Sequence, residues 1–527
     1  DILFIAMRVG TLFLWFCFLV FSAALDVQFH SGEYSMYKPL TAGDTTVKFP
    51  ARDEQIEEEC ELIQYQHVGR HGARYPFGAT VQKFILMEDR IRSIVHLPGI
   101  PEFLSSWDSS LFTKNPTYGD LSSVGAQELY NLATRLKAQN PKLARLFEWQ
   151  RNKGNLEPAN TWNSISYRFQ SSQYIHTSRS ASAFAYGLLE GQGTIGEVTN
   201  ASTGCYYEPI YVESSGEVTK RLTAYNEIQT SCPIIQKLGK KADHSTRAKD
   251  ELLGPIGERL TIEWGVGDIW NITGPVVAVM MDICAFEVSI ANDYSKFCSL
   301  FDDSDMLLYE RSKDITNFYR ESYGFPAAYE SSALLLQEIY YVMNKRMKDP
   351  SDFQAAMIRF GHHQTVGSLL SLLKIFKDEE ILVSDVMYDI NEKFPWKSSR
   401  FTPFMGHVGF YLYDCGEVHK TKFRHYIKLM VNEMDVSLPQ LPIYCPYADF
   451  WNVFRDHLDD SLEKICSRYY SFLGVPEIPP NTVNEEENKS YMEGYVIVIF
   501  LIGVSLGITF RSLAHCFPKP KLKRSVL

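Results

Sequence analysis

Apolar and polar side chains alternate through residues 62–68, a pattern typical of a half-buried β-strand. After this stretch, Tyr75-Pro76 favours an extended step of the backbone, because a proline disfavours the helical conformation of the residue before it. Apolar positions then recur on a helical period over residues 79–95. The pattern therefore predicts a strand, a short polar segment and a helix in succession.

The same order returns twice further along the chain. Residues 167–173 read as a strand that leads through a polar turn ending at Arg179 into a helix over residues 181–189. Residues 356–360 read as a third strand, followed by a tight turn over residues 361–364 and an apolar helix over residues 365–376. Open α/β sheets bind ligands at the carboxyl ends of their strands, so all three junctions are candidate sites.

Between the second and third junctions the pattern becomes mostly helical, which suggests a cap inserted into the α/β part. The helical stretches are residues 224–238, 257–266, 275–291, 303–323 and 331–347. The apolar run 276–290 could be taken for a membrane span, but Asp282 and Glu287 within it favour a buried helix. An aromatic-rich strand is expected over residues 400–415.

The two ends of the chain resemble targeting and membrane segments, unlike the globular sequence between them. Residues 7–24 have the order of a secretory signal peptide, preceded by six further residues. Residues 492–513 are apolar enough to form a transmembrane helix, and a basic tail over residues 514–527 favours a cytoplasmic end. The expected order is an arm (25–50), a first α/β part (51–189), the cap (190–350), a second α/β part (351–475) and a stalk (476–491).

The cysteines agree with an oxidising compartment. Eight of the ten lie between the signal peptide and the membrane segment, an even number that allows up to four disulfides. Asn200, Asn271 and Asn488 begin N-glycosylation sequons. The chain is therefore expected to be a single-pass type I membrane protein of the secretory pathway, with the plasma membrane favoured.

Composition and charge narrow the function classes. Of the 527 residues, 45% are hydrophobic and 22% charged, with a net charge of -11, which is an ordinary globular profile. A nucleic-acid-binding protein would usually be basic, so that class is excluded. There is no CxxC pair or His-rich tract, and no metal site or cofactor is expected.

The first strand–helix junction holds the strongest candidates for anion binding and catalysis. Arg70 and Arg74 flank His71 within a short segment that also contains Gly72. Planar guanidinium groups suit phosphate oxygens, and an imidazole between them could act as a nucleophile. A solvated basic turn is the alternative interpretation of this segment taken alone.

Together these segments resemble the branch-two histidine phosphatases, a family that includes acid phosphatases and phytases. The resemblance rests on the RHGxRxP segment at residues 70–76, Arg179 after a strand, and Phe360-Gly361-His362 before an apolar helix. Residues 298–301 and 319–324 add to it, and within the branch the chain looks most like the multiple inositol polyphosphate phosphatases. The resemblance implies an α/β fold with a three-layer core, a mixed central sheet flanked by helices, and a mostly helical cap.

The family's roles carry over to individual positions of this chain. His71 would be the nucleophile that forms a phosphohistidine, and the phosphoryl oxygens would be held by Arg70, Arg74, Arg179 and His362. The resemblance also implies disulfides between Cys60 and Cys415 and between Cys284 and Cys298, and leaves the other four cysteines open.

The sequence departs from the family at one catalytic position. Acid phosphatases and phytases have an Asp after the second histidine, and the inositol polyphosphate branch has Ala and then Glu, so that a carboxyl protonates the leaving oxygen. Here these positions hold His363 and Gln364. We expect a charged His363 to be the acid, most active below its ordinary pKa of about 6.5. A missing acid, or one from elsewhere in the chain, is the alternative.

The resemblance implies a phosphatase that acts outside the cytosol on inositol polyphosphates, including inositol hexakisphosphate. Two alternatives remain open. One is a broad acid phosphatase or a bisphosphoglycerate phosphatase, and the other is a surface glycoprotein that binds phosphate ligands with impaired catalysis.

Overall fold

The fold is described from a computed structural model. The described residues are 28–45, 47–113, 118–148, 167–190, 210–236, 244–324, 326–349, 354–377, 396–416 and 422–472. Contacts divide the chain into residues 1–469 and residues 470–527, and nearly all the described residues belong to the first unit. The predicted signal peptide, stalk, membrane segment and tail lie outside the described residues, as do Asn200, Asn488 and Cys205.

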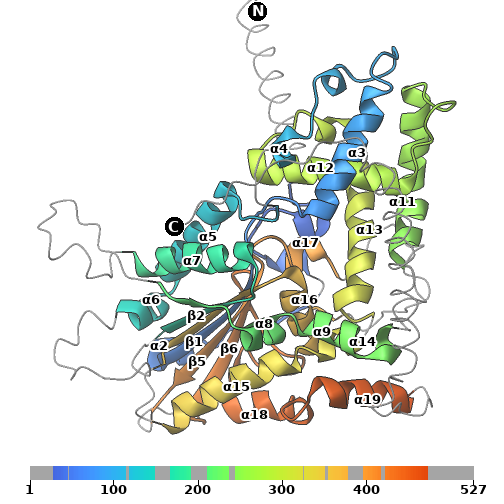
Figure 1. Cartoon of the computed structure of the whole chain (residues 1–527). Helices are drawn as coiled ribbons and strands as arrows, with labels where there is room; N and C mark the ends of the chain where they lie inside the picture. The colour runs from blue at the N-terminus through green and yellow to red at the C-terminus, as the bar shows by residue number, and fades with distance from the viewer. Residues whose placement is uncertain are drawn as a thin grey trace, which may run out of the picture. The chain divides into compact units, whose positions relative to one another are not determined.

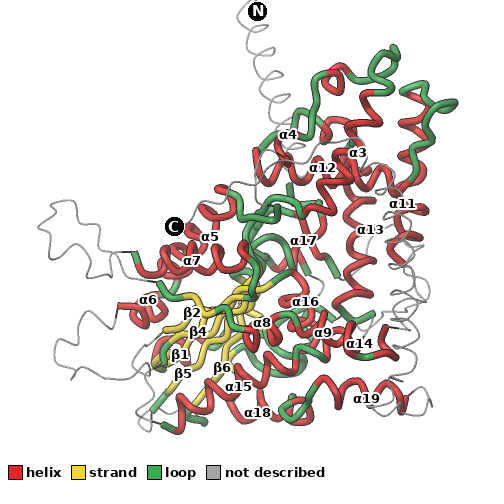
Figure 2. The backbone as a smooth tube through the Cα atoms, viewed as in Figure 1, coloured by secondary structure: helices red, strands yellow, loops and turns green. Residues whose placement is uncertain are grey.

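A mixed β-sheet forms the middle layer (Figures 1 and 2). Its strands are β1 (Glu61–Arg70), β2 (Tyr167–Ser171), β3 (Val212–Glu213), β4 (Ala356–Gly361), β5 (His407–Asp414), β6 (His425–Val431), β7 (Met434–Val436) and β8 (Tyr444–Pro446). The order is β3-β2-β4-β1-β5-β6-β7, with β8 also paired to β6. Strands β1 to β4 run parallel, and β5 joins β1 antiparallel. The predicted mixed central sheet is confirmed.

Helices and 3-10 turns fill the segments between the strands. The α-helices are α2 (Glu54–Glu59), α3 (Gly78–Arg92), α4 (Ser110–Thr113), α5 (Ser123–Gln139), α6 (Pro141–Glu148), α7 (Ile175–Leu189), α8 (Gly216–Leu222), α9 (Ala224–Ser231), α11 (His244–Glu263), α12 (Gly274–Ala291), α13 (Asp303–Glu321), α14 (Pro326–Glu330), α15 (Ala333–Lys348), α16 (His363–Leu372), α17 (Ser398–Phe401), α18 (Tyr447–Asn452) and α19 (Leu462–Phe472). The 3-10 turns are η1 (Gly32–Tyr34), η2 (Ala42–Asp44), η3 (Glu102–Ser105), η5 (Phe297–Leu300) and η6 (Arg455–His457).

Helices cover both faces of the sheet because alternate residues of each strand point to opposite faces. On one face, Tyr65 of β1 joins an apolar cluster with α5, α6 and α7. On the other face, Val68 of the same strand joins a cluster with α8, α15, α16 and α18. The result is the three-layer arrangement that was expected, visible in Figure 1 as helices on either side of the strands.

A third apolar cluster belongs to helices alone. It joins α3 and α4 to α11, α12 and α13, and the disulfide between Cys284 and Cys298 ties α12 to η5 within it. Among the described helices, α12 is the one that is long and apolar enough to cross a membrane, and 72% of its most apolar window is buried inside the protein. This burial agrees with the expected buried helix.

The cap boundaries at residues 190 and 350 stay a prediction, but the packing shows a different grouping of two helices. Helix α3, expected in the first α/β part, packs among the cap helices. Helix α15, expected in the cap, packs against the sheet. The described part of the predicted arm, residues 28–45 and 47–50, contains η1 and η2 and packs on the rest of the fold through buried Glu33.

Three disulfides link the described cysteines. The expected pairs Cys60–Cys415 and Cys284–Cys298 are present, and a third bond joins Cys232 to Cys466. Cys445 is buried and unpaired in the described part of the chain. The Cys60–Cys415 bond fixes the start of β1 to the end of β5, so it closes a loop of most of the chain.

Several predicted boundaries are wrong. The helix expected from residue 257 is α11, which begins at His244, and the strand expected over residues 400–415 is β5, which begins at His407 after α17. Helix α7 begins at Ile175, so Arg179 lies within the helix instead of in a turn before it. Helix α16 begins at His363, so His363 and Gln364 form its first turn. At the starts of α7 and α16 the polar residues that suggested a turn are the first residues of a helix, because Ser and Thr hydroxyls bond to nearby backbone in both settings. In α7 the Thr177 and Ser178 hydroxyls donate to the Tyr174 and Ile175 carbonyl oxygens.

A close backbone approach holds the segment after β1 against α5. A Cβ atom added at Gly125 would lie 2.2 Å from the carbonyl oxygen of Ala73, and one at Gly72 would lie 2.6 Å from the carbonyl oxygen of Gly125. Both of these oxygens belong to the backbone, so they cannot rotate away from an added Cβ as the end of a flexible side chain could. The two glycines therefore let α5 buttress the segment that carries Arg74.

Replacing Gly125 by Ala should destabilise the protein by about 1–3 kcal/mol, the usual cost of overpacking. The matched control is Gly216→Ala, where an added Cβ meets nothing within 4 Å. This control should leave the free energy of unfolding unchanged or raise it slightly, because alanine has fewer unfolded conformations than glycine. Denaturant unfolding of both variants measures the difference, and equal stabilities would contradict the close approach.

Candidate functional site

Strand register brings three distant segments to one edge of the sheet. Arg70 at the end of β1 pairs with Gly361 at the end of β4, and Ser171 at the end of β2 pairs with Phe360. Because these strands are parallel, the residues that follow them leave the sheet side by side. His71, Ser172 and His362 are those residues. All three predicted strand–helix junctions therefore meet at one place.

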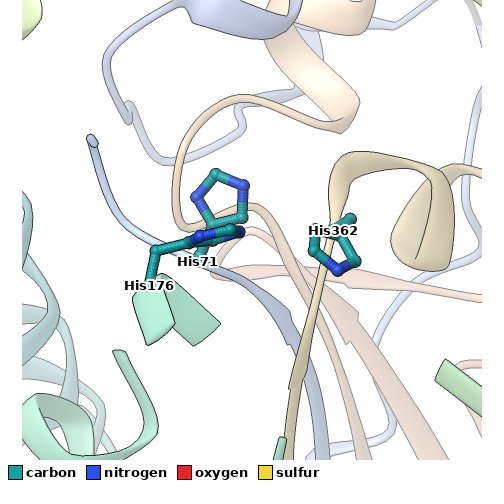
Figure 3. A group of neighbouring side chains, drawn as sticks. All are labelled: His71, His176 and His362. Atoms are coloured by element: carbon teal, nitrogen blue, oxygen red, sulfur yellow. The ribbon is translucent and has the colours of Figure 1, made fainter. Parts of the chain in front are cut away.

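His71 lies at the centre of this place with one ring nitrogen free. Its Nδ1 donates a hydrogen bond to the Gly72 carbonyl oxygen at 2.8 Å, so a neutral ring has its lone pair on Nε2. The ring centroid lies 4.5 Å from that of His176 and 5.8 Å from that of His362. Figure 3 shows the three rings gathered above the strand ends. Burial, followed by the positive groups around it, lowers the pKa of His71 well below 6.5, which keeps Nε2 unprotonated.

Arg70 and Arg74 are buried cations next to His71. Arg70 is only 1% exposed and donates to the carbonyl oxygens of Glu33 and Thr402, while its guanidinium stacks 4.4 Å from the Phe404 ring centroid. Arg74 is also buried and donates to the Tyr75 carbonyl oxygen at 2.8 Å.

Neither guanidinium forms an ion pair among the described residues, and burial lowers the pKa of Arg70 to about 9 and that of Arg74 to about 10. Both groups remain charged at neutral pH, with positive charge that an anion would neutralise.

Arg179 reaches the same place from α7. Three residues before it, His176 contacts the His71 ring, and directly after it Ser180 accepts a hydrogen bond from the Gly72 backbone N–H at 3.1 Å. The Arg179 side chain is 55% exposed and pairs with Asp120, whose carbonyl oxygen accepts from the Tyr75 backbone N–H. The structure thus holds Arg179 beside the segment of residues 70–75, at the open side of the site.

His362 completes the group as the N-cap residue that directly precedes α16. Its Nε2 lies 3.1 Å from the Ser172 hydroxyl, and its backbone N–H donates to the Thr365 hydroxyl at 2.9 Å. Burial, followed by His363 and the two buried arginines, lowers the pKa of His362 to about 3. A neutral His362 can donate only one ring N–H, so its role in anion binding is that of a hydrogen-bond donor.

His363 does not match the charged acid that was expected. Burial lowers its pKa well below 6.5, and Arg70 adds to this effect, so the ring is neutral in the free protein at pH 6.5. Its Nδ1 lies 2.9 Å from a carboxyl oxygen of Glu321 at the end of α13. Gln364 is buried next to it in the first turn of α16.

Sequence reasoning assigned no role to several residues that meet here. His176 lies two residues into α7, and its position three residues before Arg179 was the signal that could have included it. Glu33, Phe404 and Glu321 approach from η1, the loop before β5 and the end of α13. Their separation along the chain gave no comparable signal.

The site suits an anion better than a cation. The ligand nitrogens of His71, His176 and His362 lie within 4.8 Å of one another, which is close enough to hold a metal ion. A cation between them would also face the unpaired guanidinium groups of Arg70 and Arg74, at a strong electrostatic cost. A phosphoryl group would instead find cationic donors for its oxygens and a free imidazole nitrogen opposite phosphorus.

These groups suit the chemistry of phosphoryl transfer, which needs cationic groups around the phosphoryl oxygens. The family model of the histidine phosphatase superfamily, branch 2, matches residues 61–432. The chain belongs to this family and is a histidine-type phosphoric monoester hydrolase.

Similar proteins agree with this assignment. The multiple inositol polyphosphate phosphatase 1 of Dictyostelium discoideum is 24% identical over 522 residues, covering 87% of this chain and 77% of its own length. A thiamine-repressible acid phosphatase of Schizosaccharomyces pombe is 23% identical over 469 residues, with coverages of 84% and 90%. The crystal structure of the phytase from D. castellii shares the fold with a TM-score of 0.58 at 17% identity, and the match covers 86% of this chain and 88% of that one.

The position of Arg179 predicts that it strengthens anion binding. Arg179→Gln should weaken the thermal stabilisation by orthophosphate and lower kcat/KM by about 10- to 100-fold, since a hydrogen bond to a charged group contributes about 1.5–3 kcal/mol. The matched control is Arg92→Gln on α3, which also removes an exposed arginine paired to a carboxylate, that of Glu88. An equal phosphate response in both variants would exclude Arg179 from the site.

Proposed function

We propose that this phosphatase hydrolyses inositol polyphosphates, including inositol hexakisphosphate, through a phosphohistidine at His71. The observation that carries the proposal is the free Nε2 of a buried, neutral His71 beside two buried guanidinium groups that form no ion pair in the described structure. Arg70, Arg74, Arg179 and His362 hold the phosphoryl oxygens.

The reaction has two steps with the phosphoryl group held in one place. In the first step, the lone pair of His71 Nε2 attacks phosphorus, the bond to the ester oxygen breaks, and an acid–base group of the site gives its proton to the departing alkoxide. In the second step, water attacks the phosphohistidine and loses a proton to the same acid–base group, orthophosphate leaves, and the neutral imidazole returns. The positive groups stabilise the charge that spreads over the equatorial oxygens in both steps.

The substrate class is supported by the names of similar proteins. The Dictyostelium discoideum relative is an inositol polyphosphate phosphatase, and the structural neighbour from D. castellii is a phytase. The Schizosaccharomyces pombe relative supports the second candidate, a broad acid phosphatase. A bisphosphoglycerate phosphatase and a binder of phosphate ligands with impaired catalysis are the remaining alternatives, the last favoured by the absence of a carboxyl at positions 363 and 364.

The proposed location is outside the cytosol, in the secretory pathway or at the plasma membrane. Three disulfides among the described residues support an oxidising compartment. Asn271 is exposed, as an N-glycan acceptor must be. The membrane anchor at residues 492–513 and glycans at Asn200 and Asn488 belong to the same proposal.

Phosphate release by the purified full chain tests the substrate. Inositol hexakisphosphate should give a higher kcat/KM than bisphosphoglycerate or p-nitrophenyl phosphate, and His71→Ala should abolish release from all three. Because the pKa of His71 is lowered well below 6.5, its nucleophilic nitrogen stays free in acid, and activity should persist through pH 5. Activity equal to that of His71→Ala on every ester would favour the phosphate binder, and a preference for p-nitrophenyl phosphate would favour the broad acid phosphatase.

A further inference from the structure

Glu321, the last residue of α13, is a buried carboxyl group in contact with the site. It is 0% exposed, and neither of its carboxyl oxygens has a well-aligned hydrogen bond among the described residues. One oxygen lies 2.9 Å from Nδ1 of His363, which is itself buried and lacks any other partner in the described structure. The contact is short but not straight, as catalytic hydrogen bonds often are before substrate binds.

Helix α16 leaves room for this carboxyl group. A Cβ atom added at Gly367 would lie 2.8 Å from Oε1 of Glu321, so a larger residue at that position of the helix would displace the carboxyl group. The hydroxyl of Ser368 in the next position donates to the Glu321 carbonyl oxygen at 3.3 Å. The end of α13 is thereby fixed against the first two turns of α16, with the carboxyl group directed at His363.

The ring of His363 connects Glu321 to the site. Its side chain keeps 13% of its surface exposed although Nδ1 is buried, so the exposed part is not the nitrogen that faces Glu321, and Nε2 is the ring nitrogen left for a contact with substrate. The preceding residue, His362, has its ring 5.8 Å from that of His71. The charged and titratable groups that face His363 come from several parts of the fold. They are Arg70 at the end of β1 and Arg74 after it, Glu33 on η1, Arg320 and Glu321 on α13, and His362 directly before α16.

Stability does not explain a carboxyl group in this position. Burying a carboxyl without aligned hydrogen bonds costs free energy, and an apolar side chain of similar size would avoid this cost. Buried polar groups that lack aligned hydrogen bonds, and groups with strongly shifted pKa values, are concentrated at functional sites.

We propose that Glu321 is a positioning residue that orients His363 and supplies, through its ring, the proton taken up by the leaving oxygen. The inference rests on the proposed function, because it concerns the same reaction at His71. It answers the question raised by the missing carboxyl at positions 363 and 364, since the carboxyl comes from α13 instead.

The protonation states of Glu321 and His363 fit this transfer of a proton through the His363 ring, which is called the relay below. Burial raises the pKa of Glu321 to about 8, so its carboxyl holds a proton at pH 7, while the pKa of His363 is lowered and the ring is neutral. A protonated carboxyl that donates to Nδ1 leaves the ring hydrogen of His363 on Nε2, the nitrogen that does not face Glu321.

The proton movements balance over the two steps. When the ester bond breaks, Nε2–H of His363 gives its proton to the alkoxide and Nδ1 receives the Glu321 proton, which leaves a carboxylate and a neutral ring. When water attacks the phosphohistidine, Nε2 takes the water proton and Nδ1 returns its proton to Glu321. The free enzyme is restored with no further reactant.

A leaving-group series separates this role from a structural one. For Glu321→Gln, kcat/KM for benzyl phosphate should fall by about 100-fold, the usual range for a lost general acid, because its alkoxide needs a proton. Phenyl phosphate should lose less, and p-nitrophenyl phosphate should be nearly unchanged because nitrophenolate leaves without a proton. In the wild type, activity on benzyl phosphate should also decline above about pH 8 as Glu321 loses its proton, and Glu321→Gln should lack this limb.

Three further variants test whether Glu321 and His363 act together and whether the loss of another buried carboxyl has the same effect. His363→Ala should show the same leaving-group dependence, and the double variant should lose no more than His363→Ala, since residues that act as a unit are not additive. Glu287→Gln is the matched control, because Glu287 is a buried carboxyl on α12 that accepts from Trp107 and Phe297. It should leave the leaving-group dependence as in the wild type.

Equal losses on benzyl and p-nitrophenyl phosphate in Glu321→Gln, with a normal unfolding temperature, would overturn the relay and leave the proposed phosphatase reaction standing. A wild-type enzyme no more active than His71→Ala on all three esters would instead overturn the proposed function itself.

Discussion

Two buried guanidinium groups that have no carboxylate partner among the described residues dominate the electrostatics of this site. Placing Arg70 and Arg74 out of water costs free energy, and the protein returns only part of it through backbone carbonyl oxygens and the faces of Phe404 and Phe77. A phosphoryl group would supply the missing negative charge. The same burial that makes the empty site costly therefore makes it selective for an anion, and it keeps His71 neutral and nucleophilic.

The rest of the fold holds these groups in position around one site. The parallel pairing of β1 with β4 and of β4 with β2 places residues 71, 172 and 362 side by side, although nearly 300 residues separate the first from the last. The arm at residues 28–45 and the loop before β5 then close over Arg70 from two further directions. Helix α13 spans from the helical cluster to the first turn of α16 and brings a buried carboxyl to His363.

Much of this arrangement could be predicted from local sequence. Strand periodicity located β1, β2 and β4, and the family resemblance singled out Arg70, His71, Arg74, Arg179 and His362 at or after the ends of these strands. The starts of α7 and α16 were misjudged because polar residues that favour turns also favour the first turn of a helix.

Glu321 was missed because its importance depends on tertiary packing. At the sequence level it is one acidic residue at the end of a helical pattern, and its burial against Gly367 is visible only in the fold. The lowered pKa of His363 has the same origin, since it follows from desolvation and from the buried Arg70.

The most direct test is to trap the covalent intermediate. Wild-type enzyme mixed rapidly with p-nitrophenyl phosphate and quenched in alkaline denaturant, where a phosphohistidine survives, should yield a single phosphorylated peptide by mass spectrometry. The account predicts the phosphoryl group on the imidazole of His71 and none in His71→Ala. Phosphate release by an active enzyme without this adduct, or with the adduct on another residue, would contradict it.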